Sequence, residues 1–201
     1  AQNRRESLIA VCEYAKNTFI KQLWESDEGK SLGLPYFRGE RGFRDDIIKK
    51  FELGYSLGTR DAFTKEALQH GYKDEFLRDS GLTIFGENNY KADRFWGRVM
   101  FPIHSISGRV VAFGGRVMKK SDKVAKYINS PETELYHKSD IVYGIFHAKN
   151  EIAKRDKCYL VEGYTDVIVT LINSEGSATF NNCDRYLSAK PFFFALSRTS
   201  V

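Results

Sequence analysis

The fold is decided by a stretch near the middle of the chain, RVMFPIHSISGRVVAFGGRV, residues 98–117. Its two runs, 98–103 and 109–117, are rich in β-branched and aromatic residues, and a Ser-Gly pair lies between them. Two such runs around a short turn predict a β-hairpin. Because Pro102 has no backbone N–H, it predicts an edge strand or the point where strand pairing ends.

The stretches on both sides of this hairpin predict helices. Apolar residues recur every three or four positions from Leu8 to Leu23, which makes one apolar stripe along a helix, and Gly29 follows as its expected stop. The other expected elements are a glycine-rich loop over 33–42, helices over 45–54, 61–70 and 74–79, a strand over 127–129, a helix over 141–153, a buried strand over 157–161 and a helix over 164–171.

The bulk composition excludes several classes of protein. The chain has 201 residues, of which 42% are hydrophobic and 28% charged, and this excludes collagen, coiled coils and wholesale disorder. The length suits one large domain or two small ones. No apolar run approaches the roughly 18–20 residues of a membrane-spanning helix, and no apolar region of a signal peptide follows the polar start. We therefore expect no membrane partner and a cytoplasmic location.

The three cysteines, Cys12, Cys158 and Cys183, lie far apart, with no histidine at a ligand spacing. An odd number of widely spaced cysteines predicts neither a disulfide framework nor a zinc site. A reducing compartment fits this pattern. The chain also lacks an initiator methionine, so we expect it to be part of a longer protein.

The net charge of +5 is concentrated in one segment. Residues 91–126 hold nine Lys or Arg against two Asp, a local charge of +7, with aromatic residues interleaved. Basic side chains neutralise phosphates, and aromatic faces stack the bases of a single strand. The segment therefore predicts a surface for single-stranded nucleic acid. A solvated strand face with its aromatic residues in the core is the alternative.

Six motifs, in order along the chain, resemble the bacterial replicative primase of the DnaG type. They are YFRGERG (36–42), FELGY (51–55), DRFWGRVMFPI (93–103), GRVVAFGGR (108–116), KYINSPET (126–133) and VEGYTDV (161–167). The fold class implied by the resemblance is α+β, a mixed helical and β N-terminal subdomain of the primase core followed by the beginning of an α/β TOPRIM fold. The expected domains are 1–155 for the subdomain, 156–172 for the TOPRIM start, and 173–201 for a divergent or out-of-register tail.

The resemblance implies synthesis of short RNA primers on a single-stranded DNA template, the activity of a DNA-directed RNA polymerase. A basic ridge near the cleft of that family grips the template, and Arg41, Arg116 and Lys126 match its positions, with Arg98 and Arg109 as weaker candidates. The two glycines before Arg116 have no side chain that would hold a phosphate backbone away. Arg41 rests on the resemblance alone, and a surface salt bridge explains it equally well. In a hairpin, Arg98 and Arg109 face solvent or pair with acids.

Glu162 matches the TOPRIM glutamate of the family, which implies a catalytic and metal-binding role. Phosphoryl transfer from a nucleoside triphosphate to a 3′-hydroxyl needs Mg²⁺ or Mn²⁺, and α/β sheets gather ligands past the ends of their strands. A glutamate favoured by the dipole at a helix N-terminus is the alternative, and Asp166 fits that description better than it fits a metal ligand. The resemblance also implies a zinc-binding domain before Ala1 and a replicative helicase as a partner of the full-length protein.

The chain departs from the family after residue 163. The family holds its metals with an Asp-x-Asp pair at a later strand end, whereas only Asp166 and Asp184 follow here, and they form no such pair. We therefore expect a primase fragment that binds the template strand and is inactive alone. A non-catalytic single-stranded-DNA-binding module is the alternative.

Overall fold

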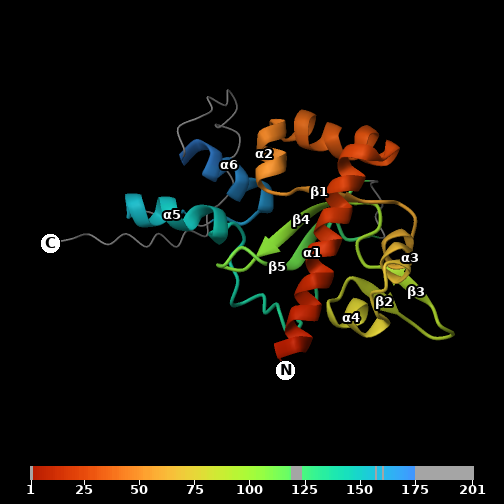
Figure 1. Cartoon of the computed structure of the whole chain (residues 1–201). Coiled ribbons are helices and arrows are strands. Elements are labelled where there is room, and N and C mark those ends of the chain that lie inside the picture. Colours follow the sequence, from red (N-terminus) through yellow and green to blue (C-terminus); the bar gives the residue numbers. More distant parts are fainter. Residues whose placement is uncertain (1, 119–123, 157, 160, 175–201) are drawn as a thin grey trace.

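A four-stranded antiparallel sheet, in the order β1-β4-β5-β6, lies at the centre of the fold. The computed structural model describes residues 2–118, 124–156, 158–159 and 161–174 (Figure 1). The strands of this sheet are β1 (Gly54–Ser56), β4 (Arg98–His104), β5 (Val110–Val117) and β6 (Tyr127–Asn129). The predicted hairpin is β4–β5 and the predicted third strand is β6, so both predictions are confirmed.

Pro102 lies where pairing ends on one side of β4. The ladder with β1 ends at Met100, two residues before the proline, whereas Pro102 itself still lies opposite Phe113 of β5. Since proline cannot donate a ladder hydrogen bond, it is tolerated where one neighbour has stopped. The prediction that pairing ends at Pro102 is therefore right for the β1 side, although β4 is not an edge strand.

Helices flank this sheet, and a second small sheet was not predicted. The helical elements of the described residues are α1 (Gln2–Glu25), the π-helical turns η1 (Gly29–Gly33) and η2 (Tyr36–Glu40), α2 (Asp45–Lys50), α3 (Ala62–Gln69), α4 (Asp74–Asp79), α5 (Ile145–Arg155) and α6 (Tyr164–Ser174). The second sheet pairs β2 (Thr83–Phe85) with β3 (Lys91–Asp93). Each α-helix corresponds to a predicted one, and the mixture with antiparallel strands confirms the α+β class. Among the helices that the structure describes, none is long and apolar enough to cross a membrane.

The predicted loop over 33–42 is wrong for most of its length, because η1 and η2 make the segment helical. Glycine and proline suggested a loop, but Pro35 has a φ of −59°, which suits the start of a helical turn. Gly29 does not end α1, which stops at Glu25; a β-carbon at Gly29 would overlap the backbone oxygen of Gln22. This glycine therefore permits close packing of η1 against α1.

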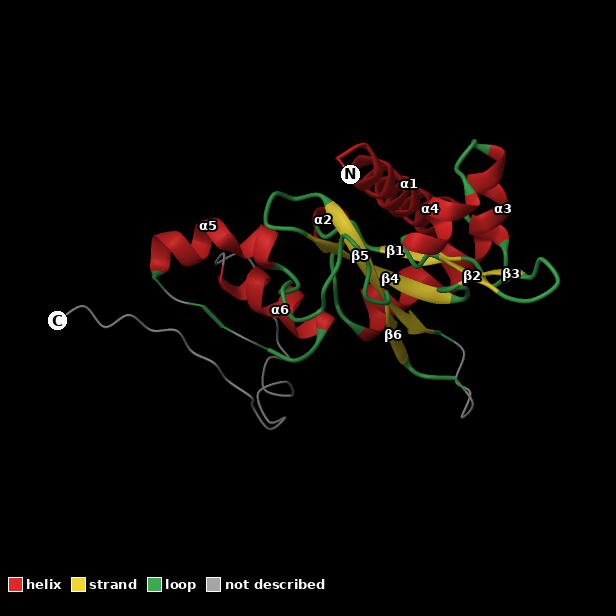
Figure 2. Ribbon diagram, turned by 90° about the horizontal axis from the view of Figure 1, so that it is seen from below, coloured by secondary structure: helices red, strands yellow, loops and turns green. Residues whose placement is uncertain are grey.

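α1 and α6 pack against opposite faces of the sheet. Met100 and Phe113 belong to the core cluster that contains most of the apolar stripe of α1. Val99 and Phe101 belong to a second cluster that contains Ile168 of α6. Since neighbouring side chains of a strand point to opposite faces, the two clusters lie on the two sides of β4. In Figure 2 the strands run between α1 and α6.

Asp93, the first residue of the third motif, has a structural role. Its side chain is buried, and it accepts hydrogen bonds from the backbone N–H groups of Phe63 and Thr64, both at 2.8 Å, and from the Thr64 hydroxyl at 2.6 Å. The first N–H groups of a helix have no partner inside the helix. Asp93 therefore caps α3 from a neighbouring strand, and burial raises the pKa of its carboxyl group.

The predicted buried strand over 157–161 is wrong at the residues that the structure describes. Cys158, Tyr159 and Val161 lie in no strand, and Tyr159 is 62% exposed. A strand is stable only beside a partner, and none of the described strands pairs with this segment. Lys157 and Leu160 lie outside the described residues.

The expected boundary between residues 155 and 156 stays a prediction. Ile168 of α6 is buried in the same cluster as Phe37 of η2, so residues on both sides of that boundary share a core. Residues 175–201, which make up most of the predicted tail, lie outside the described residues.

Candidate nucleic-acid interface

A buried tyrosine contacts two of the arginines that were predicted to grip the template. Tyr36 is the first residue of η2 and is 1% exposed. The Nε of Arg41 donates a hydrogen bond to the Tyr36 hydroxyl at 2.8 Å, and the Arg41 guanidinium carbon lies 5.2 Å from the ring centre. The guanidinium carbon of Arg116, in β5, lies 4.3 Å from the same ring centre. Both cations are therefore within reach of cation–π attraction to one ring.

Tyr127 and Lys126 extend this group toward solvent. Arg116 lies opposite Tyr127 in the β5–β6 ladder, so their side chains share one face of the sheet. Burial raises the pKa of Tyr36, which keeps its hydroxyl protonated. Tyr127 is 38% exposed and Lys126 is exposed. We name Tyr36, Arg41, Arg116 and Tyr127 the Tyr36 cluster; Lys126 lies beside it in the sequence.

The Tyr36 ring supports the Arg116 side chain. The only acid within ion-pair range among the described residues is Glu40, whose Oε2 lies 3.9 Å from Nη2, and the buried Nε has no hydrogen-bond partner. An ion pair at that distance with an exposed glutamate contributes little. Arg116 is therefore oriented mainly by the ring and by its place in β5.

The +7 segment does not form one continuous basic surface in the described residues. Lys91 is paired with Asp74 at 2.7 Å, and Arg109 with Glu6 at 2.8 Å, as predicted for a hairpin arginine that pairs with an acid. Residues 119–123, which hold three of the lysines, lie outside the described residues. Charge counted along the sequence thus overestimates the charge that these residues present together.

The prediction that Arg98 faces solvent or pairs with an acid is wrong. Arg98 is 5% exposed, and its Nη1 donates to three backbone oxygens, of Gly115 at 3.3 Å, Ala125 at 3.0 Å and Lys126 at 3.3 Å. Burial lowers the pKa of its guanidinium group. Arg98 therefore fixes the backbone that leads into β6, including that of Lys126. The predicted contact of Arg98 with nucleic acid stays a prediction, and its side chain is buried.

The two glycines before Arg116 serve packing, and the expectation that they leave room for a phosphate backbone is wrong. A β-carbon at Gly114 would overlap the ring of Tyr164, and one at Gly115 would lie 2.8 Å from Phe95. The Tyr164 ring stacks on Phe101 at 5.1 Å between centres, and its hydroxyl donates to the Asn129 side chain at 2.7 Å. Gly114 therefore lets the start of α6 dock on β5.

The start of α6 packs in the same core as Tyr36. Ile168 of this helix belongs to the core cluster that contains Tyr36, and Tyr164 packs against that cluster. Asp166 lies in the first turn, and burial raises the pKa of its carboxyl group. Glu162, the predicted catalytic glutamate, is exposed two residues before the helix begins.

The sequence of this chain matches one known protein family. The family described as DNA primase catalytic core, N-terminal domain, matches residues 18–149, which include the whole Tyr36 cluster and Lys126. The chain belongs to the bacterial DnaG primase family. A DNA primase of Streptomyces coelicolor is 38% identical over 170 residues, which cover 83% of this chain and 26% of that primase. The chain thus spans about a quarter of the length of this curated relative.

Two solved DnaG structures share the fold. The RNA polymerase domain of Mycobacterium tuberculosis DnaG, in complex with a double-stranded DNA oligomer with a 6-nucleotide overhang, matches with a TM-score of 0.77 and 36% identity, over 85% of this chain and 52% of that one. A DnaG primase catalytic domain bound to single-stranded DNA matches with a TM-score of 0.74 and 29% identity, over 88% of this chain and 55% of that one. The α+β core is therefore that of DnaG primases.

The described residues contain no group of three or more His, Cys, Asp or Glu side chains that could hold a metal ion. Mg²⁺ often binds through one or two carboxylates together with substrate phosphates and water. Glu162 is exposed, so its carboxylate is accessible to such an ion. Its catalytic and metal-binding role stays a prediction.

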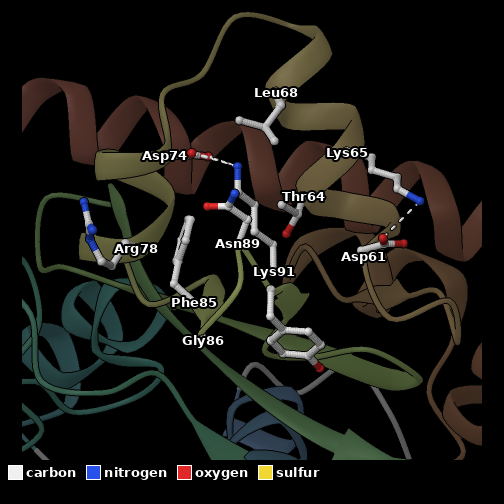
Figure 3. Close-up of a pocket in the computed structure, with 11 residues that line it drawn as sticks. Asp61, Thr64, Lys65, Leu68, Asp74, Arg78, Phe85, Gly86, Asn89 and Lys91 are labelled. Carbon is white, nitrogen blue, oxygen red and sulfur yellow. Dashed lines mark hydrogen bonds and ion pairs between the residues drawn. The ribbon is translucent and has the colours of Figure 1, made fainter.

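A hollow of about 770 Å³ lies between α3, α4 and the β2–β3 hairpin (Figure 3). On its wall, the cationic groups of Arg78 and Lys91 lie 5.4 and 5.7 Å from the ring centre of Phe85, and Lys91 is paired with Asp74. None of the residues predicted to bind the template lines it. In Figure 1 the elements that surround the hollow, α3, α4, β2 and β3, lie on the other side of the molecule from α6.

Sequence reasoning missed Tyr36 and Tyr127 as members of the site. Both stand in the primase motifs, Tyr36 five residues before Arg41 and Tyr127 directly after Lys126. A chemical argument could have found Tyr36, because a buried tyrosine hydroxyl needs a hydrogen-bond partner. Arg41, a basic residue of the same motif, was the nearest candidate for that partner in the sequence.

Proposed function

We propose that the chain binds the single-stranded DNA template for a DNA primase, the RNA polymerase that makes short primers during replication. The observation that carries this proposal is that Arg41 and Arg116 both contact Tyr36, while Tyr127 lies opposite Arg116 in the sheet, next to the exposed Lys126. Contacts from Arg and Lys to phosphates position a strand without reading its sequence. The exposed Tyr127 offers a face on which a base can stack. The primase relative bound to single-stranded DNA supports the same reading.

In this proposal Glu162 contributes to the reaction centre at the start of α6. When bound, a divalent ion, Mg²⁺ or Mn²⁺, would neutralise the charge that develops on the transferred phosphoryl group. The carboxylate of Glu162 would hold it, together with ligands from the rest of the primase. Nucleoside triphosphates as substrates, zinc in an upstream domain, a replicative helicase as partner and a cytoplasmic location belong to the same proposal and follow from the family.

Salt dependence of binding tests the proposed interface. If Arg41, Arg116 and Lys126 each neutralise a phosphate, log affinity for labelled single-stranded DNA should fall against log salt with a slope of about −2, since each contact contributes about −0.7. Lys126→Ala should weaken binding and reduce the slope by about 0.7. Lys65→Ala removes another exposed lysine, which lies on α3 and pairs with Asp61, and should leave both values unchanged. A slope near zero in fluorescence anisotropy would rule out this interface.

Primer synthesis separates the fragment from a complete enzyme. The chain offers one metal ligand in its described part, so we expect no RNA product from a DNA template, ribonucleotides and Mg²⁺ or Mn²⁺. A related primase with its whole RNA polymerase domain serves as the positive control. Products that form with the chain alone and disappear in Glu162→Gln would contradict the expectation.

A non-catalytic single-stranded-DNA-binding module is the second candidate, and the incomplete set of metal ligands in the described residues favours it. Joining this chain to the remaining RNA polymerase core of a related primase distinguishes the two. Primers made by the joined protein support a primase fragment, and DNA binding without synthesis supports the module.

A further inference from the structure

We propose that Tyr36 is a positioning residue, which orients Arg41 and Arg116 for the template strand without touching it. This inference rests on the proposed template-binding function. Tyr36 is 1% exposed, so it cannot itself contact a strand. Both arginines are more exposed than Tyr36. Arg41 meets its hydroxyl and Arg116 meets its ring.

The hydroxyl of Tyr36 sets the first of these side chains. It accepts a hydrogen bond from Nε of Arg41 at 2.8 Å. Because the guanidinium group is planar, a bond to Nε fixes the direction of the Nη atoms, which are the usual donors to phosphate. The hydroxyl therefore fixes the orientation of Arg41 at the end of η2.

The ring of Tyr36 sets the second side chain. The guanidinium carbon of Arg116 lies 4.3 Å from the ring centre, and Nε of Arg116 has no hydrogen-bond partner among the described residues. The ring is itself held by burial and by Phe37, whose ring centre lies 5.3 Å away. Arg116 is thus oriented by a rigid neighbour rather than by a flexible acid.

This orientation should be measurable as affinity. A long side chain that is free before binding loses rotamer freedom when it binds, and a side chain already in place loses less. Removing the Tyr36 hydroxyl loosens Arg41 while it leaves the charge of the chain unchanged. The expected loss of affinity for single-stranded DNA is about three- to tenfold.

The test is Tyr36→Phe, which keeps the ring beneath Arg116 and removes only the hydroxyl. Tyr55→Phe is the matched control, since Tyr55 is equally buried, lies in the same core cluster and donates its hydroxyl to Glu28 at 3.1 Å. We expect Tyr36→Phe to bind labelled single-stranded DNA three- to tenfold more weakly at one salt concentration, and Tyr55→Phe to bind as the wild type. Wild-type affinity in Tyr36→Phe would overturn the proposal.

A double-mutant cycle shows whether Tyr36 acts through Arg41. In the Arg41→Ala background, the part of the Tyr36→Phe effect that is transmitted by Arg41 should vanish, whereas a general loss of structure would persist. Effects of Tyr36→Phe that are equal in both backgrounds would overturn the positioning role. Arg41→Lys keeps the charge and removes the fixed fork, so it should lose affinity as Tyr36→Phe does; full affinity there contradicts the proposal even if Tyr36→Phe fails to fold.

Failure of the inference and failure of the proposed function give different results. If Arg41→Ala weakens binding and Tyr36→Phe does not, the interface stands and Tyr36 has no positioning role. If Arg41→Ala, Arg116→Ala and Lys126→Ala all bind as the wild type, the proposed interface itself is wrong.

Discussion

The double variant Arg41→Ala/Arg116→Ala should bind single-stranded DNA about 100-fold more weakly than the wild type at low salt. A hydrogen bond to a charged group contributes roughly 1.5–3 kcal/mol, and about 1.4 kcal/mol corresponds to a tenfold change in affinity. Both arginines contact Tyr36, so they present their charge from one place. Titration of a labelled single strand, followed by fluorescence anisotropy, measures the change.

The control must remove the same charge from the same region. Arg38 and Arg44 flank Arg41 in the sequence, and their exposed guanidinium groups pair with Asp45 and Asp46. Arg38→Ala/Arg44→Ala should therefore lower the affinity no more than about threefold, through the general field alone. Equal losses in the two double variants would mean that net charge, and not the Tyr36 cluster, binds the strand.

Short-range sequence patterns correctly predicted the first helix and the central hairpin. The predicted stripe became α1, and its residues Leu8, Val11, Cys12, Ala15, Phe19 and Leu23 are buried. The β-rich runs became β4 and β5. Gly29 misled the prediction of where the first helix ends, because composition shows that a glycine is present but not what lies against it. Here the glycine allows close packing of two helical segments. Pro35 likewise suggested a loop over 33–42 although it suits a helical turn.

Long-range contacts account for the parts that the sequence did not predict. The segment 157–161 has strand-like composition, yet strand formation depends on a partner that the described sheet does not provide. Arg98 looks solvent-facing in a hairpin, but three backbone oxygens converge on it from β5 and the approach to β6. The resemblance supplied Arg41 and Arg116, and only the folded chain places both against the ring of Tyr36.

Gly114→Ala should lower the free energy of unfolding by about 2 kcal/mol. The new methyl group would overlap the ring of Tyr164, which cannot move freely because it stacks on Phe101 and donates to Asn129. Overpacking of this kind costs roughly 1–3 kcal/mol, and for a chain of this size 2 kcal/mol corresponds to about 4–8 °C in the thermal midpoint. Thermal unfolding followed by circular dichroism measures the shift.

Two comparisons assign this cost to the contact with Tyr164. A β-carbon added at Gly39, in η2, would have no described atom within 4 Å, so Gly39→Ala should not lower the midpoint. In a Tyr164→Ala background the ring is absent, and Gly114→Ala should then cost less than about 0.5 kcal/mol, because the methyl group fills space that the ring has left. An undiminished cost in that background would show that Gly114 is required by the strand itself. A vanishing cost would mean that this glycine seats α6, and with it Glu162, on the sheet that carries Arg116.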